Sequence, residues 1–332
     1  MILNPAIIAL NFGSLLLSIF AVYASYFGLK IIRHWDIASG SDLQLSLERK
    51  TYLISTVLTY LMAFELLSFF LFVYTADSLH EMFVGAMCAA GALNVDSCGY
   101  LTLLVKILNV VLCGLWLVLN HVDSRGYDYP LIRPKYKLLL AVSALLLLET
   151  YLQWTYFGAL NADVITSCCG ALFSQDNPSI AGDLATISPG VGKILLFVSL
   201  YFILRIGLQL FFTGSGAVWF AGASSWFFVF SAVALISFIS VYYYELPTHH
   251  CPFCLLQLEY HHIGYVFYIS TLAGGILGLS VGTLNRYRDI LSLKRIIPPA
   301  QKKLCMGSMI SYSIFAATAG YPMIFSDFKL AG

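Results

Sequence analysis

Long apolar runs separated by short polar connections organise this chain of 332 residues. A membrane-spanning helix needs about 20 mostly apolar residues. Eight segments meet that length, and no connection between them is long enough to hold a soluble domain. The pattern predicts an all-α fold, a single transmembrane domain over residues 1–332 built as a polytopic bundle of about eight helices, approximately 6–32, 52–76, 100–121, 137–159, 191–213, 216–244, 260–284 and 304–325.

The composition agrees with a bilayer environment. Hydrophobic residues make up 59% of the chain and charged residues 11%, whereas a soluble domain carries roughly 25% charged residues. The first apolar run is longer than the apolar core of a signal peptide, so we expect it to remain as a helix. A net charge of +1 gives no electrostatic reason to expect a nucleic-acid partner.

Positive charges alternate along the connections. Lys and Arg gather in the first, third and seventh connections, while the second, fourth and sixth carry acidic residues but no Lys or Arg. The basic residues are Lys30, Arg33, Arg49, Lys50, Arg125, Arg133, Lys135, Lys137, Arg286, Arg288, Lys294, Arg295, Lys302 and Lys303. Loops rich in Lys and Arg stay in the cytoplasm. We therefore expect both termini on the outer side of a bacterial or archaeal inner membrane, with the lipid bilayer as the first partner.

Three cysteine pairs fall in connections that this topology places outside: Cys88 with Cys98, Cys168 with Cys169, and Cys251 with Cys254. Structural disulfides are ordinary outside the cytosol, and a Cys88–Cys98 bond is one interpretation. Adjacent cysteines rarely bond to each other, so Cys168 and Cys169 are expected to bond elsewhere or to bind a ligand.

A weak internal echo links two of these connections. Glu65 lies in one predicted helix and is followed by a loop with Cys88-Ala-Ala-Gly-Ala-Leu; Glu149 lies in another and is followed by Cys168-Cys-Gly-Ala-Leu. A duplicated helical hairpin would explain this similarity.

Four ionisable residues sit well inside predicted helices: Glu65, Lys106, Glu149 and Arg205. A charge at the bilayer centre is costly, so such residues usually pair and often carry function. At about 1.5 Å rise per residue, either base lies at a depth from which it could reach either acid. One interpretation is two structural ion pairs; the other is a proton path or the polar wall of a quinone or ion site.

The most polar island, residues 243–265, concentrates the candidate chemistry. It holds Cys251-Pro-Phe-Cys254 together with His249, His250, His261 and His262. We expect the Cys-x-x-Cys segment to open the seventh helix, where the helix dipole favours the reactive thiolate. The same donors suit Zn(II) or Cu(I), with His249, His250, His262 and both cysteines as candidate ligands.

The segment Cys251-Pro-Phe-Cys254-Leu-Leu-Gln257 resembles the Cys-x-x-Cys-x-x-Gln-Arg motif of the DsbB family of quinone-linked thiol oxidants, and a similar logic holds for vitamin K epoxide reductase-like proteins. The resemblance covers seven residues, and Leu258 stands at the position of the Arg. It implies that Cys251 and Cys254 form a redox pair near a quinone, with Gln257 beside it. A second pair would come from Cys88 and Cys98 or from Cys168 and Cys169.

Three hypotheses follow. The first is a membrane thiol–disulfide oxidoreductase that exchanges with an extracytoplasmic thiol protein and passes electrons to a quinone, with His250, His261 or Tyr260 assisting proton transfer, since histidine titrates near neutral pH. The second is a protein that binds or transports copper, zinc or mercury. The third is an anchor or assembly subunit for other membrane proteins with structural disulfides. The sequence has no evident Walker motif or Ser-His-Asp arrangement, which argues against an ATPase or a hydrolase.

Overall fold

The computed structural model describes residues 3–162, 164–167, 169–173, 182 and 188–328. The described part is helical apart from turns, loops and one isolated bridge between Val84 and Ile165. The chain divides into two compact units, where a single domain was expected. The first unit comprises residues 1–75, 96–161 and 286–300, and the second comprises 76–95, 162–285 and 301–332.

Seven helices in the described residues are long and apolar enough to cross a membrane, which indicates a multi-pass membrane protein; they span Pro5–His34, Asp42–Met82, Ser97–Asp123, Ile132–Ala159, Pro189–Thr213, Ala217–Tyr244 and Ile263–Asn285. These seven match the first seven predicted segments. The eighth forms α12 (Ile297–Phe325), which has the length of a span but is less apolar because serines and tyrosines interrupt it. An eighth membrane crossing therefore stays a prediction.

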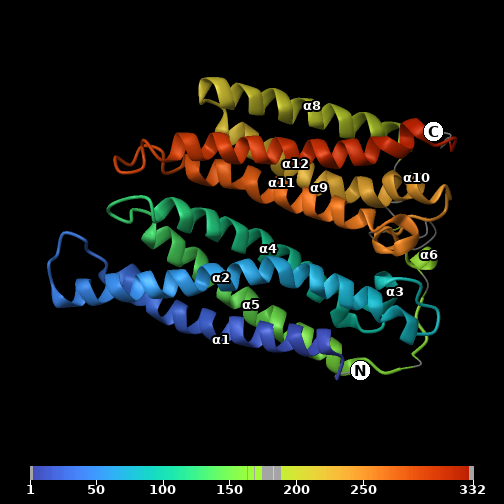
Figure 1. Cartoon of the computed structure of the whole chain (residues 1–332), viewed down its shortest axis with the longest axis horizontal. Coiled ribbons are helices and arrows are strands. Elements are labelled where there is room, and N and C mark those ends of the chain that lie inside the picture. Colours follow the sequence, from blue (N-terminus) through green and yellow to red (C-terminus); the bar gives the residue numbers. More distant parts are fainter. Residues whose placement is uncertain (1–2, 163, 168, 174–181, 183–187, 329–332) are drawn as a thin grey trace. The chain divides into compact units, whose positions relative to one another are not determined.

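The first unit is built from α1 (Pro5–His34), α2 (Asp42–Ser78), α4 (Ser97–Asp123) and α5 (Ile132–Ala159). Figure 1 draws these four helices, coloured blue to green, running alongside one another. Local signals set their ends: the Asn4 side chain accepts a hydrogen bond from the Ala6 N–H, and Asp96 accepts one from the Cys98 N–H. On α1, Phe12, Leu16 and Ile19 are largely exposed, as suits a face that contacts lipid.

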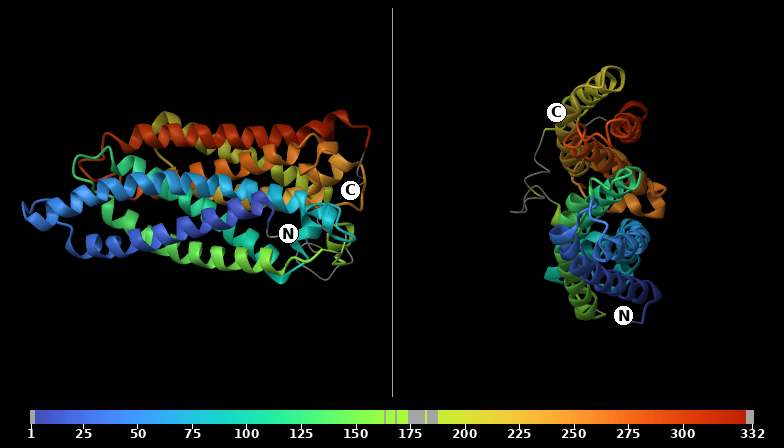
Figure 2. Two further views of the ribbon diagram at one scale, coloured as in Figure 1. Left: turned by 60° about the horizontal axis from the view of Figure 1, so that its bottom comes forward. Right: turned by 90° about the vertical axis from the view of Figure 1, so that its left-hand side faces the viewer.

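The second unit contains α8 (Pro189–Thr213), α9 (Ala217–Ala234), α10 (Ser240–Tyr244) and α11 (Ile263–Asn285), with most of α12. The left view of Figure 2 shows its long helices, yellow to red, running alongside one another. Small residues allow this close packing. A Cβ on Gly274 would meet the Tyr312 ring at 2.5 Å, and a Cβ on Gly278 would meet the Ser224 Oγ at 1.9 Å.

One π-helical turn, η2 (Leu235–Ile239), separates α9 from α10. Such turns shift the backbone hydrogen-bonding register and often occur at functional sites. Here the Ile236 carbonyl accepts a hydrogen bond from Nδ1 of His250, at 3.0 Å. The turn therefore fixes the start of the Cys-x-x-Cys segment against the helix that precedes it.

Candidate functional site: three buried thiols in the second unit

Two loops of the second unit are joined by a short backbone pairing. The Val84 N–H donates to the Val164 carbonyl at 3.1 Å, and the Thr166 N–H donates to the Val84 carbonyl at 2.9 Å. Gly85 has a φ of +89°, and a Cβ there would lie 2.5 Å from the Thr166 carbonyl oxygen. Only glycine permits the two backbones to lie this close at Gly85. The close contact holds the backbone that leads to Cys88, three residues later.

Cys88 directly precedes the short helix α3 (Ala89–Leu93) and is its N-cap residue. The Asp77 carboxylate accepts a hydrogen bond from the Ala89 N–H at 3.0 Å, which holds the start of this helix. A second contact comes from Gln257, whose Nε2 donates to the Met87 carbonyl at 2.6 Å. Gln257 thus ties the Cys-x-x-Cys loop to the loop that carries Cys88, and its contact with a quinone stays a prediction.

The Cys-x-x-Cys segment does not open a long helix, so that prediction was wrong. Cys254 begins a single 3-10 turn, η3 (Cys254–Leu256), a second such turn follows as η4 (Leu258–Tyr260), and α11 begins only at Ile263. Gln257 between the two turns is extended, and His261 and His262 adopt left-handed backbone with φ of 52° and 55°. A dipole from a long helix therefore does not act on these thiols.

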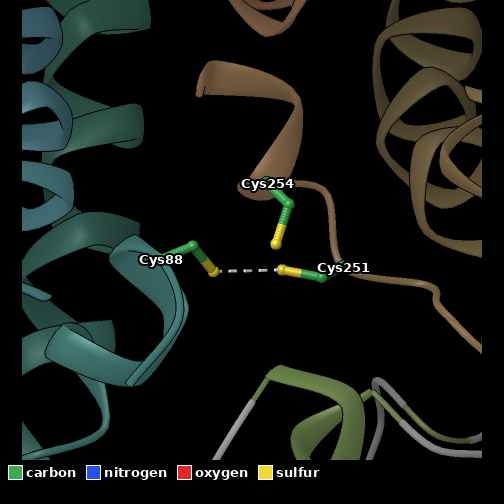
Figure 3. Close-up of side chains that lie close together, drawn as sticks. All are labelled: Cys88, Cys251 and Cys254. Atoms are coloured by element: carbon green, nitrogen blue, oxygen red, sulfur yellow. Dashed lines mark hydrogen bonds between the residues drawn. The ribbon is translucent and has the colours of Figure 1, made fainter. Parts of the chain in front are cut away.

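The structure brings Cys88, Cys251 and Cys254 together, and their Sγ atoms all lie within 4.8 Å of one another. The Cys88 and Cys251 Sγ atoms are 3.6 Å apart. Figure 3 shows the three side chains pointing toward one spot, Cys88 from the first loop and the other two from the Cys-x-x-Cys segment. Cys88 and Cys251 are 0% exposed and Cys254 is 5% exposed. Among the described residues, this is the one group of three or more Cys, His, Asp or Glu donors arranged to hold a metal ion.

The four histidines of the island occupy different environments. His249 lies beside the thiols, with Nε2 at 3.4 Å from the Cys254 Sγ. His250 is buried and uses Nδ1 on the Ile236 carbonyl, while its Nε2 has no hydrogen-bond partner among the described residues. His262 uses Nδ1 on the Leu256 carbonyl, and His261 is exposed. Of the three histidines predicted as ligands, His249 is therefore the one that contacts a thiol of this group.

Two tyrosines hold the backbone of the Cys-x-x-Cys segment. The Tyr244 hydroxyl donates to the Cys251 carbonyl at 2.6 Å, and the Tyr268 hydroxyl donates to the Pro252 carbonyl at 3.1 Å. Sequence reasoning missed both roles, because tyrosines at the end of a spanning helix are equally typical of membrane-interface anchors. The two helices that flank the segment thus fix its position.

The remaining cysteines have separate places. Cys98 lies at the start of α4 in the first unit, and both it and Cys88 are free thiols, so the structure does not contain a Cys88–Cys98 disulfide. Cys169 begins the short helix α6 (Cys169–Leu172), just as Cys88 precedes α3. Cys168 lies outside the described residues. The fourth predicted connection still reaches the site, since the Phe173 and Phe253 rings lie 6.5 Å apart.

A second polar group lies inside the first unit. Lys106 Nζ is 2.5 Å from Glu149 Oε1 and 3.7 Å from Glu65 Oε1, with all three side chains about 1% exposed. The sequence prediction that Lys106 could reach both acids is confirmed. Arg205 belongs to the second unit, is exposed on α8, and makes no ion pair with a described residue, so its predicted pairing is not observed.

Comparison with protein-family models, curated proteins and solved structures finds no match to this chain. The function must therefore be argued from the two polar groups themselves.

Proposed function

We propose that this multi-pass membrane protein binds a thiophilic metal ion, Cu(I) or Zn(II), at Cys88, Cys251 and Cys254. The observation that carries the proposal is the convergence of three buried sulfurs from two distant loops. A Zn–S bond of about 2.3 Å places the sulfurs of a tetrahedral site about 3.8 Å apart. The 3.6 Å between the Cys88 and Cys251 sulfurs is close to that spacing.

The surroundings favour a cation. The chain around Cys254 is apolar, and Phe253, Leu255 and Leu256 are all buried. Binding a metal deprotonates coordinating thiols, and the ion's positive charge then compensates thiolates that an apolar site would otherwise disfavour. Three sulfurs alone suit Cu(I), whereas adding the His249 imidazole gives the four donors that Zn(II) prefers.

The test is metal analysis of the purified protein after exposure to Cu(I) or Zn(II). We expect one tightly held ion per chain and its loss in Cys88→Ser, Cys251→Ser and Cys254→Ser. Cys305→Ser is the matched control, because Cys305 is also buried but contacts the Gly207 carbonyl. Equal metal content in the control and the three variants would overturn the proposal.

The 3.6 Å contact between Cys88 and Cys251 also supports a second candidate, a thiol–disulfide oxidoreductase. The Cys88 thiolate would attack Cys251 Sγ in a Cys251–Cys254 disulfide, breaking that bond and releasing Cys254 as the thiolate. Forming the Cys251–Cys254 disulfide from two thiols releases two electrons and two protons, which a quinone would accept to become a quinol. The burial of the thiols suits such a lipid-soluble oxidant.

Trapping distinguishes this second function. In Cys254→Ser, mild oxidation should accumulate a Cys88–Cys251 disulfide, detected as a linked peptide pair by mass spectrometry, and added quinone should accelerate disulfide formation in the wild type. No quinone effect would reject the redox function. If neither metal binding nor quinone-dependent exchange is found, the anchor or assembly subunit becomes the better account.

The proposed topology has this site on the outer side of a bacterial or archaeal inner membrane, with eight crossings and both termini outside. Its support is the alternation of basic and acidic connections along the chain.

A further inference from the structure

The polar group inside the first unit has more acid than base. Glu65 on α2 and Glu149 on α5 face Lys106 on α4, and the three are about 1% exposed. If both carboxyl groups were ionised, the group would carry one uncompensated negative charge. Burying an unpaired charge is strongly unfavourable, so the site needs one further positive charge.

The depth of Glu65, Lys106 and Glu149 in the membrane strengthens the requirement for a further positive charge. Lys106 lies nine residues into α4, and Glu149 lies ten residues before the end of α5. At about 1.5 Å rise per residue, both lie near the middle of a hydrocarbon core about 30 Å thick. Bulk water or salt ions therefore do not neutralise the charge in the closed site.

Neutral and titratable neighbours complete the surroundings. Lys106 also donates to the Ser68 hydroxyl at 3.1 Å, and Asn109 donates to Glu149 Oε2 at 2.6 Å. Cys113 on α4 is a further titratable side chain, buried about one helical turn beyond Asn109. On α1, the neighbouring helix packed against α5, Asn11 and Ser14 accept hydrogen bonds from Gln153 and bring no charge.

Both carboxyl groups lie beside the same ammonium, with Lys106 Nζ at 2.5 Å from Glu149 Oε1 and at 3.7 Å from Glu65 Oε1. Two ionised carboxylates cannot share a hydrogen bond, whereas a carboxylic acid can donate to a carboxylate. Two buried acceptors, Glu65 Oε1 and Asn109 Oδ1, have no hydrogen-bond partner among the described residues. A proton on the glutamate pair would turn one of its acceptors into a donor.

We propose that Glu65 and Glu149 form a binding site for one exchangeable proton, which they share beside Lys106. With the proton bound, the group is neutral; without it, the group carries a single negative charge. This site uses residues of the first unit only and does not depend on the metal site.

Infrared difference spectroscopy of the protein in lipid nanodiscs tests the proposal through the C=O stretch of protonated carboxyl groups. We expect one such signal in the wild type and its loss in both Glu65→Gln and Glu149→Gln, because the acid that remains pairs with Lys106 as a carboxylate. Lys106→Met should gain a second protonated carboxyl. Glu81→Gln, at an exposed glutamate, is the control and should leave the signal unchanged.

The outcomes are distinct. A wild type without the signal, or a Glu149→Gln variant that retains it, would overturn the shared proton. Transfer to D2O should shift the signal, and a signal that never shifts would overturn its exchange. The two single Glu→Gln variants remove charge without changing size, so failure of one variant to fold leaves the other as the test.

Discussion

The Sγ atoms of Cys88 and Cys251 lie 3.6 Å apart although 163 residues separate them in the chain. The pairing depends on connections between loops: a backbone bridge from Val84 to Ile165 and a hydrogen bond from Gln257 to the Met87 carbonyl. Closing a loop of this length costs conformational entropy, so the supporting contacts matter as much as the thiols.

The first prediction concerns His249. If its imidazole is the fourth donor to Zn(II), His249→Gln should weaken Zn(II) affinity by at least the roughly 10–100-fold that follows the loss of a group that only orients a ligand. Competition with a chromophoric chelator measures this affinity. His261→Gln is the control, because His261 is exposed and should leave the affinity unchanged. Equal affinities in the two variants would remove His249 from the account.

The second prediction concerns the clamp at Gln257. Gln257→Leu removes a hydrogen bond to the Met87 carbonyl, a loss of about 0.5–1.5 kcal/mol. The loop that carries Cys88 should then open more often, and alkylation of Cys88 by a small maleimide should accelerate. Gln209→Leu, an exposed glutamine on α8, should not change that rate. An unchanged rate in the Gln257 variant would show that other contacts hold Cys88.

The third prediction concerns helix packing in the second unit. Gly278→Ala places a methyl group 1.9 Å from the Ser224 Oγ, so it should destabilise the fold by about 1–3 kcal/mol. Gly222→Ala is the control, because nothing lies within 4 Å of its added Cβ. Thermal unfolding in detergent compares the two. A Gly278 variant as stable as the control would contradict the observed approach of α9 and α11.

The fourth prediction concerns topology. Ala38→Cys lies in the first connection and Thr248→Cys in the sixth, and both positions are exposed. In intact cells, a membrane-impermeant maleimide should add label only to the Thr248 variant, relative to the parent protein. Labelling of both or of the Ala38 variant alone would contradict the proposed orientation.

Local apolar length was enough to predict the seven spans, since a buried or lipid-facing helix is encoded by consecutive residues. Depth along those helices also predicted that Lys106 could reach Glu65 and Glu149, and the structure shows both contacts. The structure of residues 251–262 was not predictable in the same way. The left-handed backbone at His261 and His262, and the hydrogen bond from Gln257 to a carbonyl 170 residues away in the chain, are not encoded in the local apolar pattern.

The partners of the cysteines show the same limit. Sequence grouped Cys88 with Cys98 because they share a connection, whereas Cys88 contacts Cys251. By depth alone, Arg205 was as able as Lys106 to reach the two glutamates, yet it lies on the exposed face of α8. The sequence gives the depth of a side chain along its helix. Whether that side chain meets a partner also depends on which way its face of the helix points.

X-ray absorption at the metal edge tests the central claim most directly. In protein loaded with Cu(I) or Zn(II), the account predicts three sulfur ligands at about 2.3 Å, both in the wild type and in the Cys305→Ser control. A first shell made only of nitrogen and oxygen would contradict the assignment of Cys88, Cys251 and Cys254 as the metal ligands.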